Sequence, residues 1–311
     1  MRLPIALLVA AIALGVWLDA AQEGRSGTRF RTRLDRVTIT ATVLDADGRL
    51  VTDLAAGEFE VYEDGVRQQL TQFARERVPV SLALLLDVSD SMYGRRIVEA
   101  RTAVSRFLFD LLDPADEFLL MTFNHVPSLV VPWMTDPDEA QARIDGIRPR
   151  GGTAIYDAVL AALPHLETRT RQRAAVVLIS DGADTASDVT VRDVRAALLR
   201  SDAFVYAIAI DPPGGRAINA RVNPYTLRQI TDESGGRTEV VKDTSELGAA
   251  TAGIAEELNQ QYVLAYTSAR AADGRYHALR VRVTRPDHRV RARRGYVAGE
   301  LTRSSGRDSR W

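Results

Sequence analysis

Oxygen-bearing side chains cluster in three short segments, each of which borders an apolar run. Segment 87–91 has the pattern Asp-x-Ser-x-Ser and follows the apolar run 80–86. Segment 151–153 (Gly-Gly-Thr) opens a helical stretch, and segment 179–182 (Ile-Ser-Asp-Gly) closes an apolar run. Hard divalent cations such as Mg²⁺ prefer oxygen ligands in a tight octahedron. Short side chains at the turn from a strand to a helix can supply those ligands, so the three segments predict a metal site.

The three segments resemble the metal-ion-dependent adhesion site of von Willebrand factor type A (VWA) domains. That site combines Asp-x-Ser-x-Ser with a downstream Thr and a further Asp, and the resemblance covers roughly residues 80–261. A single Asp-x-Ser-x-Ser is a weak signal, whereas the complete set, in the family's order, is specific. The resemblance implies bound Mg²⁺ (or Mn²⁺ or Ca²⁺) and a protein ligand that offers an acidic residue. The matching positions are Asp87, Ser89, Ser91, Thr153 and Asp181.

Helix capping is the alternative explanation, because Ser, Thr and Asp are favoured N-cap residues. Capping alone would not require five oxygen side chains at the ends of three strands. In the metal site, the neutral hydroxyls of Ser89 and Ser91 contact the ion and leave it electron-poor. By the resemblance, Asp87 and Asp181 hold the site through water or hydrogen bonds. A position left open or filled by water can then accept a carboxylate from another protein.

Other side chains are expected at the same edge, because ligands of open α/β sheets bind outside the carboxyl ends of the strands. Tyr93, His125, Asp184 and Asp211 fall in loops at that edge and are candidates for the face that contacts a partner. A histidine in such a loop is more often simply exposed than functional. The long loop that begins at Asp211 either shapes the choice of partner or is a plain surface loop.

The sequence lacks the motifs of several enzyme classes. Phosphatases with an Asp-x-Asp motif need a second acid where this chain has Ser89. The Gly-x-Ser-x-Gly nucleophile elbow of serine hydrolases is absent. The only lysine, Lys242, belongs to no phosphate-binding loop. We therefore expect a binding protein and not an enzyme. The alternatives are a metal-indifferent structural or regulatory component of a cell-envelope complex and, least favoured, a hydrolase that uses the ion as a Lewis acid.

Charge and composition narrow the possible partners further. The 311 residues include 40 basic and 41 acidic side chains, so the net charge of −1 does not favour nucleic acid. Arg280 and Arg282 alternate with apolar residues, which is typical of a solvated sheet face. The absence of cysteine excludes disulfides and thiol catalysis.

The N-terminal segment predicts export. An almost unbroken apolar run at 3–18 follows Arg2 and is short for a membrane-spanning helix. We interpret 1–21 as a secretory signal peptide or an uncleaved anchor, followed by a linker at 22–33. If the segment is a signal peptide, the protein is extracytoplasmic, either periplasmic or secreted. If the segment is not cleaved, it anchors the protein in the inner membrane, and only in that case do we expect a membrane contact. Segment 299–311 is expected to be disordered.

An alternation of strands and helices between residues 78 and 261 predicts an α/β fold. We expect a doubly wound, mostly parallel sheet of the Rossmann-like VWA type with helices on both faces and an antiparallel edge strand at 128–133. Strands are expected at 80–86, 117–123, 128–133, 174–180, 203–210 and 238–241, and helices at 94–112, 137–147, 153–167, 190–200, 223–233 and 245–260.

Two segments with β patterns, 34–77 and 262–298, flank this unit. Strands are expected at 37–43, 59–62, 66–73, 262–266, 276–284 and 289–296. Each segment alone is too small to be stable, so we expect the two to pair into a β-sandwich-like domain. The VWA unit is then inserted in this domain or flanked by it. The layout resembles a bacterial VWFA-related subgroup, with an imperfect Val-x-Asp-x-x-Gly turn at 43–48 and Arg-x-Gly-Tyr represented by Arg294-Gly295-Tyr296.

Overall fold

The computed structural model describes residues 35–210, 224–268, 270 and 273–298. The expected signal peptide, the linker, the C-terminal tail and Asp211 lie outside the described residues. In the described part of the chain, no helix is long and apolar enough to cross a membrane.

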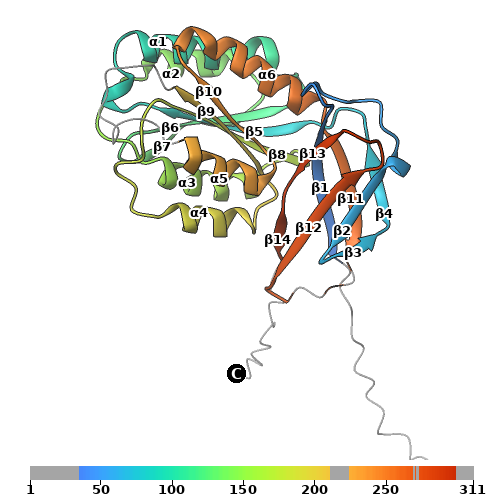
Figure 1. Ribbon diagram of the computed structural model, residues 1–311. Helices are drawn as coiled ribbons and strands as arrows, with labels where there is room; N and C mark the ends of the chain where they lie inside the picture. Colours follow the sequence, from blue (N-terminus) through green and yellow to red (C-terminus); the bar gives the residue numbers. More distant parts are fainter. Residues whose placement is uncertain (1–34, 211–223, 269, 271–272, 299–311) are drawn as a thin grey trace, which may run out of the picture. The chain divides into compact units, whose positions relative to one another are not determined.

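A six-stranded sheet has the order β10-β9-β8-β5-β6-β7 (Figure 1). All neighbouring strands are parallel except β6 and β7, which pair in antiparallel fashion at the edge, as expected. Residues of β5, β6, β8 and β9 are buried throughout, which fits strands covered on both faces. The strands are β5 (Val80–Asp87), β6 (Glu117–Phe123), β7 (Pro127–Met134), β8 (Arg173–Ser180), β9 (Phe204–Ile210) and β10 (Thr238–Val241).

Helices cover both faces of this sheet, and alternate residues of β5 contact the two layers. Leu82 and Leu84 belong to the core formed with one helix layer, whereas Ala83 and Leu85 belong to the core formed with the other. This arrangement confirms the predicted α/β fold class. One layer contains α1 (Arg95–Arg106), α2 (Asp138–Gly146) and α6 (Leu247–Asn259), and the other contains α3 (Ile155–Glu167), α4 (Val191–Leu198) and α5 (Pro224–Ser234) (Figure 1).

The predicted helix at 94–112 is not uniform. Helix α1 ends at Arg106 and continues as a π-helical turn, Phe107–Leu111, whose Phe107 and Leu108 are buried. Apolar periodicity does not distinguish these two helix types. Short 3₁₀ turns also occur at Ala56–Glu58, Asp90–Met92 and Thr244–Glu246.

The flanking β segments pair with each other in two four-stranded sheets, β13-β1-β11-β4 and β14-β12-β2-β3. Strand β1 pairs with β11, and β2 pairs with β12, both antiparallel. Their shared core includes Ile39, Phe59 and Tyr262. The strands are β1 (Asp35–Leu44), β2 (Phe59–Glu63), β3 (Val66–Gln68), β4 (Leu70–Ala74), β11 (Tyr262–Ser268), β12 (Tyr276–Val283), β13 (Arg289–Ala292) and β14 (Gly295–Val297).

Two expectations about these strands were wrong. The segments 66–73 and 289–296 each divide into two strands, and the two halves belong to different sheets. The chain changes sheet at Gln69 in the first case and at Arg293 and Arg294 in the second. Corners of this kind let strands pass between packed sheets. Alternating hydrophobicity continues through such a corner, so the pattern predicts one strand.

A buried ionic cluster connects α6 to neighbouring strands. Glu257 is 3% exposed and accepts hydrogen bonds from the hydroxyls of Thr42 (3.0 Å) and Tyr206 (2.9 Å). Its other carboxylate oxygen lies 3.1 Å from Arg237 Nε and 2.6 Å from Arg291 Nη2. Hydrogen bonds and two guanidinium groups therefore satisfy this buried charge from within the chain.

Candidate metal centre

The candidate site lies where the strand order reverses. Strands β5 and β8 are neighbours, while β6 lies on the outer side of β5 and β9 on the outer side of β8. Such a switch point opens a crevice at the carboxyl ends of the two strands. Asp87 is the last residue of β5, and Asp181 directly follows β8. The topology therefore brings the two aspartates to one edge.

Hydrogen bonds fix the loop that follows β5. Asp87 Oδ1 accepts the backbone N–H of Ser89 (2.8 Å), and its Oδ2 accepts the hydroxyl of Ser180 (2.6 Å). The Oγ atoms of Ser89 and Ser91 lie 2.9 Å apart. Ser89 is the N-terminal cap position of the 3₁₀ turn Asp90–Met92, but its side chain makes no capping hydrogen bond. The capping explanation therefore does not account for the side-chain position of Ser89.

Asp181 joins this loop to α1. Ser91 Oγ donates to Asp181 Oδ1 at 2.5 Å, and Arg96 Nη1 lies 3.0 Å from Asp181 Oδ2. The same Arg96 nitrogen donates to the carbonyl of Ser91 at 2.8 Å. Arg96 thus holds both Ser91 and Asp181 from the first turn of the helix.

Thr153 reaches the same place from the loop before α3. A Cβ atom on Gly182 would lie 3.2 Å from Thr153 Oγ1 and 3.8 Å from Ser91 Oγ. Glycine at this position leaves the space between the two hydroxyls open. The backbone of Thr153 is held by Thr185, whose N–H donates to its carbonyl at 2.8 Å. The structure thus brings together all five side chains singled out from the sequence.

The electrostatics of this edge favour a cation. Asp87 is fully buried and Asp181 is 1% exposed. Burial raises the pKa of Asp87 to about 6, and the charge of Asp181 acts in the same direction, while hydrogen bonds from Ser180 and Ser89 oppose it. No basic side chain among the described residues contacts Asp87. A cation from solution would stabilise its ionised form.

The side chains fit a hard divalent ion. All five offer oxygen, the ligand type that Mg²⁺, Mn²⁺ and Ca²⁺ prefer, and Gly182 leaves room beside two of the hydroxyls. Among the described residues there is no group of three or more His, Cys, Asp or Glu that could hold a metal. Ligation here would therefore depend on Ser89, Ser91 and Thr153 together with the two aspartates.

The four partner-face candidates differ in their surroundings. Tyr93 is 79% exposed, and His125 is exposed and packs against Gly151, where a Cβ atom would meet its Nδ1 at 2.6 Å. Asp184 is partly buried and accepts hydrogen bonds from Ser187 Oγ (2.6 Å) and from the first turn of α3. Asp184 therefore helps to fix α3, and its contact with a partner stays a prediction, as does that of Asp211.

Sequence reasoning missed two residues of this site, Arg96 and Ser180. Ser180 lies inside one of the three segments, and a hydroxyl residue directly before Asp181 could have indicated that it belongs to the site. Arg96 follows the Asp-x-Ser-x-Ser segment by five residues in a helix that begins with two arginines. Nothing in that pattern distinguishes Arg96 from its exposed neighbour Arg95.

Comparison with known proteins identifies the class of domain. Residues 82–183 match the family model of the von Willebrand factor type A domain. Bovine inter-alpha-trypsin inhibitor heavy chain H4 is 31% identical over 130 residues, which is 38% of this chain and 14% of that protein. Heavy chain H2 from Mesocricetus auratus is 27% identical over 201 residues, or 58% of this chain and 21% of that protein.

Two solved structures show the same fold at low sequence identity. A von Willebrand factor type A protein from Catenulispora acidiphila has a TM-score of 0.51 at 13% identity and covers 88% of this chain and 76% of that one. Proximal thread matrix protein 1 from the mussel byssus has a TM-score of 0.52 at 15% identity and covers 63% of this chain and 51% of that one.

The chain therefore contains a von Willebrand factor type A (VWA) domain, which the family model matches over residues 82–183. The match spans only about a fifth or less of the length of these curated relatives.

Proposed function

We propose that this protein binds a divalent cation through Asp87, Ser89, Ser91, Thr153 and Asp181 and captures a partner protein through one of the partner's carboxylates. The bound ion would supply an electron-poor coordination position that a carboxylate can occupy. The chain's own residues would orient the ion and shape the surface around it. VWA domains support a role in protein–protein interaction or adhesion.

One observation carries the proposal. Five oxygen side chains from three separate loops lie together at the switch point of the sheet, and Asp87 is buried there without a basic partner among the described residues. Buried charges are normally paired or coordinate a metal. Hydroxyl ligands leave more positive charge on an ion than carboxylate ligands do, which suits capture of an external anion.

We propose that the protein is a binding protein and not an enzyme, because its sequence has Ser89 where Asp-x-Asp phosphatases have their second acid and contains no Gly-x-Ser-x-Gly motif. We also propose that it acts outside the cytoplasm, on the basis of the apolar run at 3–18. The ion is Mg²⁺, Mn²⁺ or Ca²⁺.

The test is capture of envelope proteins by the immobilised chain in Mg²⁺ and in EDTA. We expect a partner that is retained in Mg²⁺, released by EDTA and not captured by Ser89→Ala/Ser91→Ala. Ser105→Ala serves as the control, because Ser105 hydrogen-bonds to Gln141 on the surface of α1, away from the five side chains.

Capture that is equally strong in EDTA and in the double variant would contradict the proposal. It would favour a metal-indifferent structural or regulatory component of an envelope complex.

A further inference from the structure

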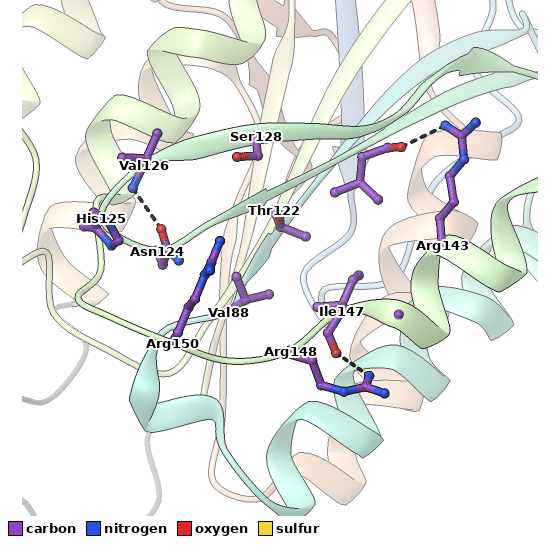
Figure 2. A pocket seen from close by; sticks show the side chains of 12 residues that line it. Val88, Thr122, Asn124, His125, Val126, Ser128, Arg143, Ile147, Arg148 and Arg150 are labelled. Carbon is purple, nitrogen blue, oxygen red and sulfur yellow. Dashed lines mark hydrogen bonds between the residues drawn. The ribbon is translucent and has the colours of Figure 1, made fainter.

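A basic pocket lies directly beside the candidate metal centre. It has a volume of about 570 Å³ and is formed by the loop after β5, the β6–β7 hairpin and the segment between α2 and Gly151 (Figure 2). This size is typical of sites for small ligands or side chains. Arg143, Arg148 and Arg150 line it together with His125, and no lining residue is acidic.

The three guanidinium groups have no carboxylate partner in the described part of the chain. Arg143 Nη1 donates to the carbonyl of Val130 at 2.9 Å, and Arg148 Nη1 donates to the carbonyls of Ile147 (2.9 Å) and Asp145 (2.7 Å). The Arg150 side chain makes no hydrogen bond or ion pair with the described residues. The nearby carboxylate of Asp145 accepts instead from Gln141 on α2.

Neutral donors complete the lining. Asn124 is 7% exposed and Thr122 is 8% exposed. Asn124 Oδ1 accepts the N–H of Val126, so its Nδ2 is a donor, and the described residues offer it no acceptor (Figure 2). The hydroxyl of Thr122 likewise has no partner there. Both side chains line the pocket, so a ligand or water in it can supply the acceptor.

The pocket and the candidate metal centre share one wall. Val88 lines the pocket and lies between Asp87 and Ser89. The backbone N–H of Arg150 donates to the carbonyl of Val88 at 2.7 Å, and the N–H of Asp90 donates to the carbonyl of Gly151 at 2.9 Å. A single extended segment of a partner can therefore reach both places.

We propose that this pocket binds a second acidic side chain of the same partner segment whose first carboxylate occupies the metal centre. This inference rests on the proposed function and names the partner's chemistry: a peptide segment with two acidic residues. The guanidinium groups form charge-assisted, bidentate hydrogen bonds to the second carboxylate, and Asn124 Nδ2 donates a further one. Exposed Val126 lines the pocket, and exposed Tyr93 follows Ser91 by two residues, so each can contact the peptide.

The experiment uses the whole chain and synthetic peptides in which one Asp and one Glu are separated by one to four glycines. A matched set carries Gln in place of Glu. Nuclear magnetic resonance follows the side-chain signals of Arg150 and Asn124, first in EDTA and then in Mg²⁺. We expect the Glu peptides to shift these signals more strongly in EDTA than the Gln peptides, which carry one carboxylate fewer. In Mg²⁺ we expect at least one Glu peptide to bind about tenfold more tightly than its Gln counterpart.

Variants distinguish binding in the pocket from binding at the metal centre. Arg148→Gln/Arg150→Gln should remove the preference for Glu but leave the affinity for the Gln peptides in Mg²⁺ unchanged. Ser89→Ala should leave the response in EDTA unchanged. Arg192→Gln, which removes an exposed arginine of α4 that does not line the pocket, controls for loss of positive charge elsewhere and should behave like the wild type.

Equal responses to the Glu and Gln peptides would overturn the inference, whether or not Mg²⁺ enhances binding. Stronger shifts with inorganic phosphate than with the Glu peptides would also overturn it, because the pocket would then be a phosphate site. A response to Glu that Mg²⁺ leaves unchanged would support the pocket and contradict the proposed metal function.

Discussion

Two buried carboxylate clusters of this protein are satisfied in opposite ways. Glu257, near the start of β9 and β10, contacts Arg237 and Arg291 as well as two hydroxyls. Asp87, at the carboxyl end of β5, accepts hydrogen bonds from Ser89 and Ser180 and contacts no basic side chain of the described residues. The first charge is neutralised by the chain itself, and we propose that a cation from outside neutralises the second.

The two clusters show how a structural charge can be distinguished from a functional one. A buried carboxylate that the fold pairs with arginine stabilises a particular arrangement, and removal of either partner leaves an unpaired charge. A buried carboxylate held only by hydroxyl and amide donors has a raised pKa, as Asp87 has, and gains from an external ion. The two clusters should therefore respond differently to the same kind of substitution.

The largest effect is expected at Glu257. Glu257→Gln should lower the free energy of unfolding by about 3–5 kcal/mol, because Arg291 loses its counter-charge and Arg237 keeps only Glu239 as a partner. Chemical denaturation followed by circular dichroism measures this. Glu256→Gln, on the exposed side of the same helix, should change it by less than about 0.5 kcal/mol. Equal stability of the two variants would contradict the structural role of Glu257.

At Asp87 the same isosteric change should affect metal binding and not folding. Asp87→Asn in EDTA should unfold within about 1 kcal/mol of the wild type, because the buried charge has no basic partner to lose. Mg²⁺ at about 100 times its dissociation constant should stabilise the wild type by about 2.7 kcal/mol and the variant not at all. A variant that Mg²⁺ stabilises as strongly as the wild type would remove Asp87 from the site.

His277 offers a third arrangement, in which the cation is titratable. Its Nδ1 lies 2.8 Å from Asp64 and its Nε2 lies 3.3 Å from Asp273, while Tyr296 packs beside the ring and Arg270 lies 3.8 Å from Asp64. Burial lowers the pKa of His277, but the two carboxylates outweigh this and raise it above 6.5; Asp64 has a lowered pKa for the complementary reason. The pair is fully formed only when His277 is protonated and Asp64 is ionised.

Because the pKa of His277 is higher in the folded state than the unfolded-state pKa of 6.5, its protonation stabilises the fold. This stabilisation is fully present below pH 6.5 and is lost as the pH rises through the folded-state pKa. A lowered aspartate pKa contributes stability that is present above 3.8 and is lost in acid. The free energy of unfolding should thus fall by about 1–2 kcal/mol on raising the pH from below 6.5 to well above it. His277→Gln should flatten this part of the profile; an unchanged profile would show that the pair does not stabilise the fold.

The smallest effect is expected at Arg96, the one basic side chain that contacts Asp181 among the described residues. Its positive charge opposes binding of a second cation. Arg96→Gln should therefore raise the affinity for Mg²⁺ about fivefold, equivalent to about 1 kcal/mol. Titration calorimetry measures this. Weaker binding in the variant would mean that Arg96 acts mainly by orienting Asp181.

Much of the fold could be predicted from the sequence because its signals are local. The apolar runs that became β5 and β8 are long and continuous, and the helices between strands have clear amphipathic patterns. The corners at Gln69 and Arg293 could not be predicted, because a change of sheet leaves the alternation of side chains intact.

The candidate site likewise contains residues that the sequence predicts and residues that it does not. Asp87, Ser89 and Ser91 share one short motif, and Thr153 and Asp181 follow at the ends of other runs, so their proximity could be predicted from sheet topology. Arg96 and the basic pocket depend on the direction of individual side chains, which periodicity does not encode. The three-dimensional positions of these side chains are needed to recognise them.

Calorimetric titration of the EDTA-treated protein with Mn²⁺ is the direct test of whether the five oxygen side chains bind one divalent ion. We predict a single site per chain in the wild type and no binding in Ser89→Ala/Ser91→Ala, with the same circular dichroism spectrum for both proteins. A double variant that binds Mn²⁺ as tightly as the wild type, or a wild type that binds none, would show that these side chains do not form a metal site.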